Sequence, residues 1–259
     1  MTFRSLALLA SMLFSLPASA FTLQTDSEGD VVQWRRAFAL VLDEALASQL
    51  GSEAATQALD AVLTELRDAT PNLAFAGSVE HLTADAIGYR AGAKNVNAIV
   101  ALVDWPYAPT NLAVTLTTLN ARTNEILDTD VLFNVTSHAL AVLPGDTLHF
   151  DRGYDFQNAL THELGHALGL LHSEDDTDLV MFPSTYVGEL CKRVFKADDR
   201  AGLRALYDTV VPSPELAASS VDGPDAAPIT GCSTSAASPL LLLSLLALCG
   251  ATLLAVWAP

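Results

Sequence analysis

Charged side chains are confined to the middle of this 259-residue chain, and this limits which part can fold into a globular domain. All 30 acidic residues lie between Asp26 and Asp225, together with every basic residue except Arg4. Beyond these points Arg4 is the one charged side chain, and both ends are largely apolar. We therefore expect one globular domain over residues 21–211, about 190 residues, which is enough for a single core. Its one cysteine, Cys191, cannot form an internal disulfide, so the core and any bound metal must hold the domain together.

The charge of the central part excludes one class of partner. Between Asp26 and Asp225 the formal charge is 12 − 30 = −18. Such a surface repels nucleic-acid phosphates, so no nucleic-acid partner is expected.

The first twenty residues have the pattern of a secretory signal peptide. Arg4 precedes an apolar stretch, and Ala18-Ser19-Ala20 provides a small-residue cleavage site. The sequence therefore predicts a signal peptide over 1–20 and an exported protein that is extracellular, at the cell surface or in the outer envelope.

The C-terminal end predicts a linker and an attachment signal. Residues 212–238 are rich in Pro, Ser and Ala and are typical of an extended linker. Residues 239–259 form a hydrophobic segment, and a helix over Leu240–Ala258 nearly spans a bilayer core. Gly231-Cys232-Ser233 followed by this segment resembles the C-terminal sorting signal of myxobacterial surface proteins. A glycolipid-anchor signal and a permanent membrane helix are the alternative interpretations.

Periodicity within the domain predicts a mixed sheet packed with helices, an α/β (α+β) fold. Apolar spacing predicts three helices, over 52–69, 156–168 and 198–207, the second capped by Asp155. Short apolar runs predict strands over 38–42, 73–75, 97–103, 113–119 and 130–133.

The segment from Thr161 to Ser173, THELGHALGLLHS, carries the strongest chemical signal. His162 and His166 are four residues apart, so they lie on one helix face and can share a zinc ion. A continuous helix would direct His172 away from that ion. Gly169 tolerates a positive φ and can end the helix, which allows the chain to turn back and makes His172 the third ligand.

Three neutral histidines leave one coordination position for water, as in catalytic zinc sites. Glu163 is placed to take a proton from a zinc-bound water during attack on a carbonyl group. The pattern therefore predicts peptide hydrolysis without a covalent intermediate, with one zinc ion as cofactor.

The same segment resembles the metzincin zinc metalloproteases, whose zinc motif is HExxHxxGxxH followed by a methionine turn. Ser173 after the third histidine is similar to the matrixin branch. Ala197–Asp208 resembles the C-terminal matrixin helix, and Asn124–Asn134 resembles the segment that precedes the site in bacterial matrixin-like proteases. The resemblance implies a zincin-like domain with a twisted, mostly parallel mixed sheet, an active-site helix and a methionine turn. It also implies that Met181 forms a hydrophobic floor below the metal and that Pro183 and Tyr186 line the substrate pocket.

The resemblance suggests further cation sites. His138, His149 and Asp151 are candidates for a second zinc site, and Asp128, Asp130 and Asp151 for calcium.

Together these features predict a monomeric, exported zinc endopeptidase that acts on protein or peptide substrates and is attached or processed through its C-terminus. Two alternatives remain open: a non-catalytic surface binding module on a zincin scaffold, and a zinc amidohydrolase of a non-peptide substrate. Glu163 favours catalysis over the binding module, since a scaffold without activity has little need for a base beside the ligands.

Overall fold

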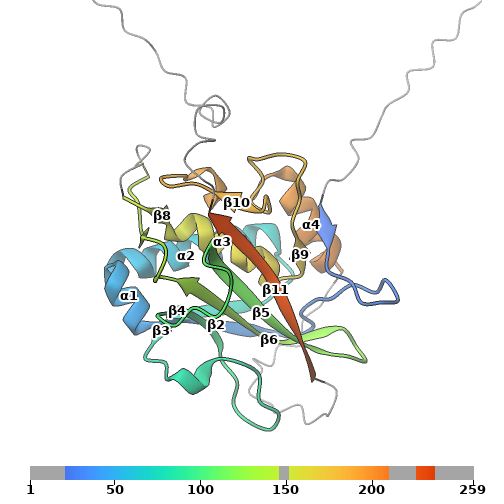
Figure 1. Ribbon diagram of the computed structural model, residues 1–259. Helices are drawn as coiled ribbons and strands as arrows, with labels where there is room; N and C mark the ends of the chain where they lie inside the picture. Colours follow the sequence, from blue (N-terminus) through green and yellow to red (C-terminus); the bar gives the residue numbers. More distant parts are fainter. Residues whose placement is uncertain (1–20, 146–151, 210–225, 237–259) are drawn as a thin grey trace, which may run out of the picture.

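A seven-stranded sheet forms the centre of the molecule in the computed structural model, which describes residues 21–145, 152–209 and 226–236 (Figure 1). The strands of this sheet are β2 (Phe38–Asp43), β3 (Phe75–Glu80), β4 (Asn97–Leu102), β5 (Asn111–Asn120), β6 (Glu125–Asn134), β10 (Ser184–Thr185) and β11 (Ala226–Ala236). The helices are α1 (Glu44–Leu50), α2 (Ser52–Ala69), α3 (Phe156–Ala167) and α4 (Ala197–Tyr207). Short elements complete the fold: β1 (Thr22–Leu23), β7 (Leu140–Ala141), β8 (Tyr154–Asp155), β9 (Leu170–Leu171) and the 3-10 turns Ala84–Ala86 and Cys191–Arg193.

The strand order is β10-β11-β5-β6-β4-β2-β3. Strands β3, β2, β4 and β6 pair in parallel, whereas β5 is antiparallel to both of its neighbours, β6 and β11. The predicted mixed, mostly parallel sheet is confirmed. Because β5 runs against its neighbours, its pairing with β6 needs only the short turn at Ala121–Asn124.

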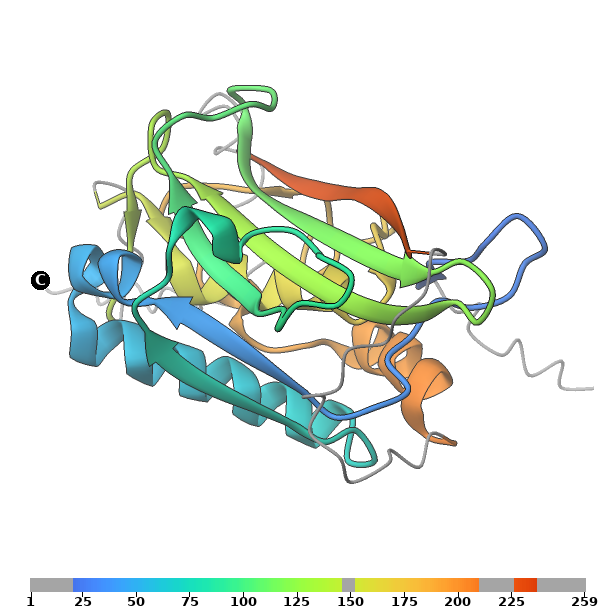
Figure 2. The same ribbon diagram turned by 90° about the horizontal axis from the view of Figure 1, so that it is seen from below.

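The helices and the main core lie on one face of this sheet (Figure 2). Phe133 of β6 meets Phe156 of α3, with ring centroids 5.3 Å apart, and Trp34 stacks on Phe38 at 4.3 Å. The opposite face carries a small cluster around Val100 and Leu132, covered by side chains from the two connections that flank β4. The buried helix α3 therefore lies between the sheet and the C-terminal part of the domain.

Most predicted elements are present, and their differences from prediction have local causes. Helix α2 has the predicted bounds, because its apolar side chains recur at helical spacing and are buried. The strand expected over 73–75 instead begins at Phe75, where residue-by-residue parallel pairing with β2 starts. Strand β6 begins five residues earlier than expected, since Asp128 and Asp130 are buried within it despite their charge.

The predicted terminal segments are mostly outside the described residues. This applies to the signal peptide over 1–20 and the hydrophobic segment over 239–259. Within the linker expected over 212–238, Ala226–Ala236 forms strand β11, which pairs with β5. Among the helices of the described ranges, none combines the length and hydropathy that a membrane span requires.

Candidate metal centre and active site

The helix that carries the first two histidines is fixed at its N-terminus by Asp155. As predicted, its carboxylate caps α3, accepting from the Asn158 N–H at 2.8 Å. The same carboxylate accepts two bonds from the Arg193 guanidinium, at 2.6 and 2.7 Å. Every residue of α3 except Gln157 is buried, so the helix is locked against the sheet on one side and residues around Arg193 on the other.

The structure brings the three predicted histidines to one point. Nε2 of His162 lies 3.1 Å from Nε2 of His166 and 3.3 Å from Nε2 of His172. Two nitrogens bound tetrahedrally at zinc distances of 2.0–2.1 Å are separated by about 3.3 Å. The donor set and its spacing therefore fit a zinc ion. Among the described residues, this is the one group of three or more metal-binding side chains close enough to share an ion.

The ring orientation of two of these histidines is set by backbone carbonyls. Nδ1 of His162 contacts Val180 O at 2.5 Å, and Nδ1 of His166 contacts Leu170 O at 2.8 Å. A carbonyl only accepts, so in each ring Nδ1 carries the hydrogen and donates it. Nε2 is then left with a free lone pair facing the common point, which is the form that binds metal.

The surroundings also keep the three rings neutral. Burial lowers the pKa of His166 to about 3 and that of His172 to about 4, and it lowers the pKa of His162 well below its ordinary value. The neighbouring rings act in the same direction on His162 and His166, because each disfavours a second positive charge. Neutral imidazoles are ready to bind a cation without first losing a proton.

Gly169 ends the helix and returns His172 to the metal point. Its φ is +97°, and a Cβ at this position would lie 2.5 Å from Val32 O, so both conformation and space require glycine. Strand β9 follows at once and pairs with β1, which directs the chain back toward α3. The predicted turn at Gly169 is therefore present.

Glu163 is fully buried and points toward β5. Its Oε2 accepts a hydrogen bond from Thr115 Oγ1 at 2.7 Å, and Thr115 Oγ1 also lies 3.1 Å from the Glu163 carbonyl oxygen. Thr115 thus ties the carboxylate of the motif to the sheet. Sequence reasoning missed Thr115, because an alternating threonine in a strand carries no signal of its partner.

Met181 lies below α3, in a turn held by a distant aspartate. A Cβ on Gly165 would be only 2.3 Å from Met181 Sδ, so the absence of a side chain at Gly165 makes room for the methionine. Asp199 accepts from the N–H groups of Val180 and Met181 at 3.0 and 3.1 Å. Burial raises the pKa of Asp199 above its ordinary value. The turn that presents Val180 O to His162 therefore depends on α4.

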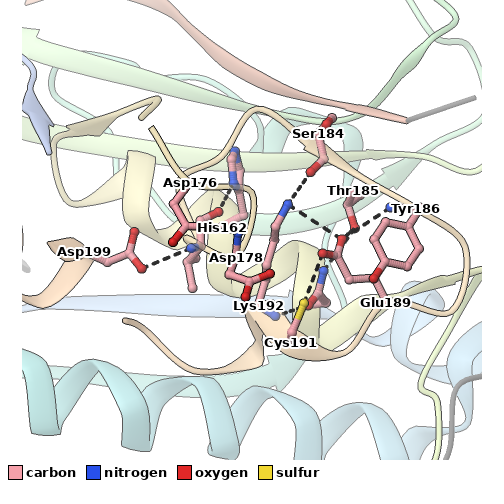
Figure 3. Close-up of polar contacts among 12 residues, drawn as sticks. His162, Asp176, Asp178, Ser184, Thr185, Tyr186, Glu189, Cys191, Lys192 and Asp199 are labelled. Atoms are coloured by element: carbon pink, nitrogen blue, oxygen red, sulfur yellow. Dashed lines mark hydrogen bonds and ion pairs between the residues drawn. The ribbon is translucent and has the colours of Figure 1, made fainter. Parts of the chain in front are cut away.

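The segment after this turn contains the predicted pocket residues Pro183 and Tyr186, which flank β10 and are half-buried. Figure 3 shows the buried cluster behind it, in which Glu189 accepts from Thr185 Oγ1 at 2.5 Å and pairs with Lys192 at 3.7 Å. Lys192 also donates to Ser184 O. Sequence reasoning missed this cluster, and nothing in the motif spacing identifies it.

The other candidate cation ligands are placed elsewhere. Nε2 of His138 contacts Pro109 O at 2.9 Å, and His149 and Asp151 lie outside the described residues. Asp128 and Asp130 are buried in β6, and burial raises their pKa values to about 8 and about 6. Asp130 accepts from the backbone N–H groups of Gly88 and Ala98. The second zinc site and the calcium site therefore stay predictions.

Comparison with known proteins agrees with this geometry. A family model described as matrixin matches residues 42–208. Matrilysin of Homo sapiens is 38% identical over 87 residues, covering 29% of this chain and 32% of that protein. Matrilysin of Rattus norvegicus is 39% identical over 87 residues, with the same two coverages. The match thus spans about a third of the length of these curated relatives.

Proposed function

The chain belongs to the matrixin family, which supports a zinc metallopeptidase in general, and we propose that it is an exported, zinc-dependent endopeptidase whose base is Glu163. The observation that carries this proposal is the convergence of three Nε2 atoms beside a buried glutamate. A binding module would need the histidines for structure but gains nothing from burying a carboxylate beside them.

His162, His166 and His172 would hold the zinc ion through Nε2. Zinc, when bound, supplies a Lewis acid that acidifies water and polarises a carbonyl group. The carbonyl oxygens of Val180 and Leu170 keep the His162 and His166 rings in the tautomer that this binding needs. The donor set thus contains three neutral ligands and leaves room for substrate and water.

Glu163 acts as the general base and then as the acid. Its carboxylate takes a proton from the attacking water and returns it to the amine that leaves when the peptide bond breaks. The Thr115 hydroxyl donates to Glu163 Oε2 at 2.7 Å and so fixes the orientation of this carboxylate. Met181 supports the site from below by packing against Gly165, and Pro183 and Tyr186 wall the substrate pocket on the side of β10.

Export and attachment form the second part of the proposal. The signal-peptide pattern at 1–20 and the hydrophobic segment at 239–259 support a protein carried across a membrane and held at, or released from, the cell surface. Calcium, bound through some of Asp128, Asp130 and Asp151, is a proposed additional cofactor, and the enzyme is proposed to be monomeric.

The test uses the full chain purified in mild detergent, with casein as an unstructured substrate. We expect one zinc ion per chain by elemental analysis and cleavage that a zinc chelator abolishes. Glu163→Gln keeps an oxygen for Thr115 but cannot accept the proton, so it should retain the zinc and lose at least about a thousandfold in turnover. Glu53→Gln, on the exposed surface of α2, is the matched control.

The outcomes separate the alternatives. Zinc at one equivalent with equal casein cleavage by Glu163→Gln would refute the proposed base. Zinc without cleavage of casein or other unfolded proteins would favour the binding module, and cleavage of small amides alone would favour the amidohydrolase. Absence of bound zinc would refute the three-histidine site.

A further inference from the structure

Strand β11 covers the edge of the sheet nearest the candidate active site. Ala226–Ala236 pairs antiparallel with β5, from Ala226 opposite Asn120 to Ser235 opposite Asn111. Without this pairing, the outer side of β5 would present a row of unpaired backbone groups, which is a template for any extended polypeptide. In Figure 1 β11 crosses the front of the molecule beside α3.

The other side of β11 contacts the segment that follows Met181. Ser235 and Ala236 pair in parallel with Ser184 and Thr185 of β10. The end of β11 is therefore held between β5, which carries Thr115, and the segment that contains Pro183 and Tyr186. We call the position in the sheet between β5 and β10, which one extended chain fills, the groove.

The pairing register identifies which residues of β11 lie opposite Thr115, the residue that bonds the catalytic glutamate. Thr230 faces Leu116 and Ser233 faces Val114, so Gly231 and Cys232 together face the single residue Thr115. This is a bulge, in which two residues oppose one and the ladder is interrupted. Thr115 is the residue that bonds Glu163, so the interruption occurs where a bound polypeptide would meet the reacting groups.

The composition of β11 suits a strand held through its backbone. Residues 226–236 read AAPITGCSTSA and contain no charged and no aromatic side chain. Strand addition of this kind derives its affinity from main-chain hydrogen bonds, which every polypeptide can offer. A substrate polypeptide and β11 would therefore compete for the same edge of β5.

We propose that the chain's own segment Ala226–Ala236 is the resident occupant of the groove between β5 and β10, and that it must detach before another polypeptide reaches Glu163. The expected competition between β11 and substrate rests on the proposed function. The occupancy of the groove by β11 does not depend on activity. Sixteen residues, 210–225, join β11 to the end of α4 and its following turn. Fully extended they reach about 50 Å, enough for binding within one molecule.

Occupancy of the groove by a tethered strand affects KM more than kcat. If the groove is open only in a small fraction of molecules, the apparent affinity for substrate falls by that fraction. Saturating substrate displaces the strand, so kcat stays unchanged while KM is raised. Detaching β11 should lower KM alone.

The first experiment measures hydrogen exchange of the zinc-free full chain, residue by residue. Ile229→Pro/Thr230→Pro is the test variant, because one of any two successive residues in an antiparallel strand directs its N–H at the partner. Ala217→Pro/Ala218→Pro adds the same two prolines in the connection and is the control. Along β5, amides alternate between β6 and β11, so we expect every second amide of residues 112–119 to exchange about tenfold faster in the test variant alone.

Three results would overturn the inference. Unchanged exchange along β5 in the test variant would mean that β11 does not cover this edge. Acceleration of both alternate sets would mean that β11 is an integral strand whose loss disrupts the sheet, and not a detachable occupant of its edge. Protection that depends on protein concentration would mean that a second copy, and not the same chain, supplies the strand.

The second experiment measures cleavage of an unrelated unstructured peptide by the zinc-loaded full chains. We expect the test variant to show a KM about tenfold lower than the control, with equal kcat. If the test variant shows faster exchange of its β5 amides but an unchanged KM, β11 does not compete with substrate. If no variant cleaves, the proposed function fails, and the exchange experiment still decides the occupancy.

Discussion

The histidine site and the segment that follows it are neighbours in the chain, but they are held by different kinds of bond. The rings of His162 and His166 are oriented by the backbone carbonyls of Val180 and Leu170. Strand β10 is instead backed by buried side chains, chiefly Glu189 and Lys192, which are 3% and 2% exposed.

This difference teaches how each region depends on the rest of the sequence. A backbone carbonyl is present whatever the side chain, so the histidines need only the correct turn in order to be oriented. The region behind β10 needs particular charged side chains, and a buried charge that loses its partner is costly. We therefore expect a single substitution behind β10 to lower the free energy of unfolding more than a single substitution in the histidine site.

The largest effect is expected for Lys192→Met, which keeps the length of the side chain but leaves Glu189 as an unpaired buried charge. The free energy of unfolding, measured with urea, should fall by about 3–5 kcal/mol, while folded protein still binds one zinc ion. Lys94→Met, on the exposed surface, is the control. Lys192→Met/Glu189→Gln should recover part of the loss, because both charges are removed. If Lys192→Met and the control have equal free energies of unfolding, the region behind β10 does not depend on its buried charged pair.

A smaller effect is expected for Gly165→Ala, because the added methyl would overlap Met181 Sδ. We expect a loss of about 1–3 kcal/mol in the free energy of unfolding. Gly145→Ala, at an exposed glycine with ordinary space for a Cβ, should change little. In the Met181→Ala background the cost of Gly165→Ala should shrink, since the overlap is gone. An undiminished cost in that background would contradict the proposed contact.

The smallest effect is expected for Thr115→Val, which removes the hydroxyl that orients Glu163 and preserves the shape of the side chain. We expect kcat to fall about tenfold, with zinc content unchanged. Thr117→Val, two residues along the same strand face, is the matched control. A fall in zinc content rather than in kcat would show that Thr115 supports the histidines and not the base.

The parts that were predicted from sequence share one property: their cause is local. The bounds of α2, the Asp155 cap and the turn at Gly169 follow from helical spacing, a side chain near its own backbone, and the freedom of φ at glycine. The grouping of His162, His166 and His172 follows from the same spacing. By contrast, nothing near Thr115 or Gly165 in the sequence indicates the partner that each one meets.

The sequence by itself therefore determined the composition of this candidate site: three histidines and a glutamate at spacings that a helix and a glycine turn convert into one site. Tertiary structure alone decided what supports and covers that site. Thr115 meets Glu163 across 48 residues of sequence, Asp199 meets the turn at Val180–Met181, and Ala226–Ala236 lies along β5. Such contacts depend on how distant segments pack together, and local periodicity does not predict that packing.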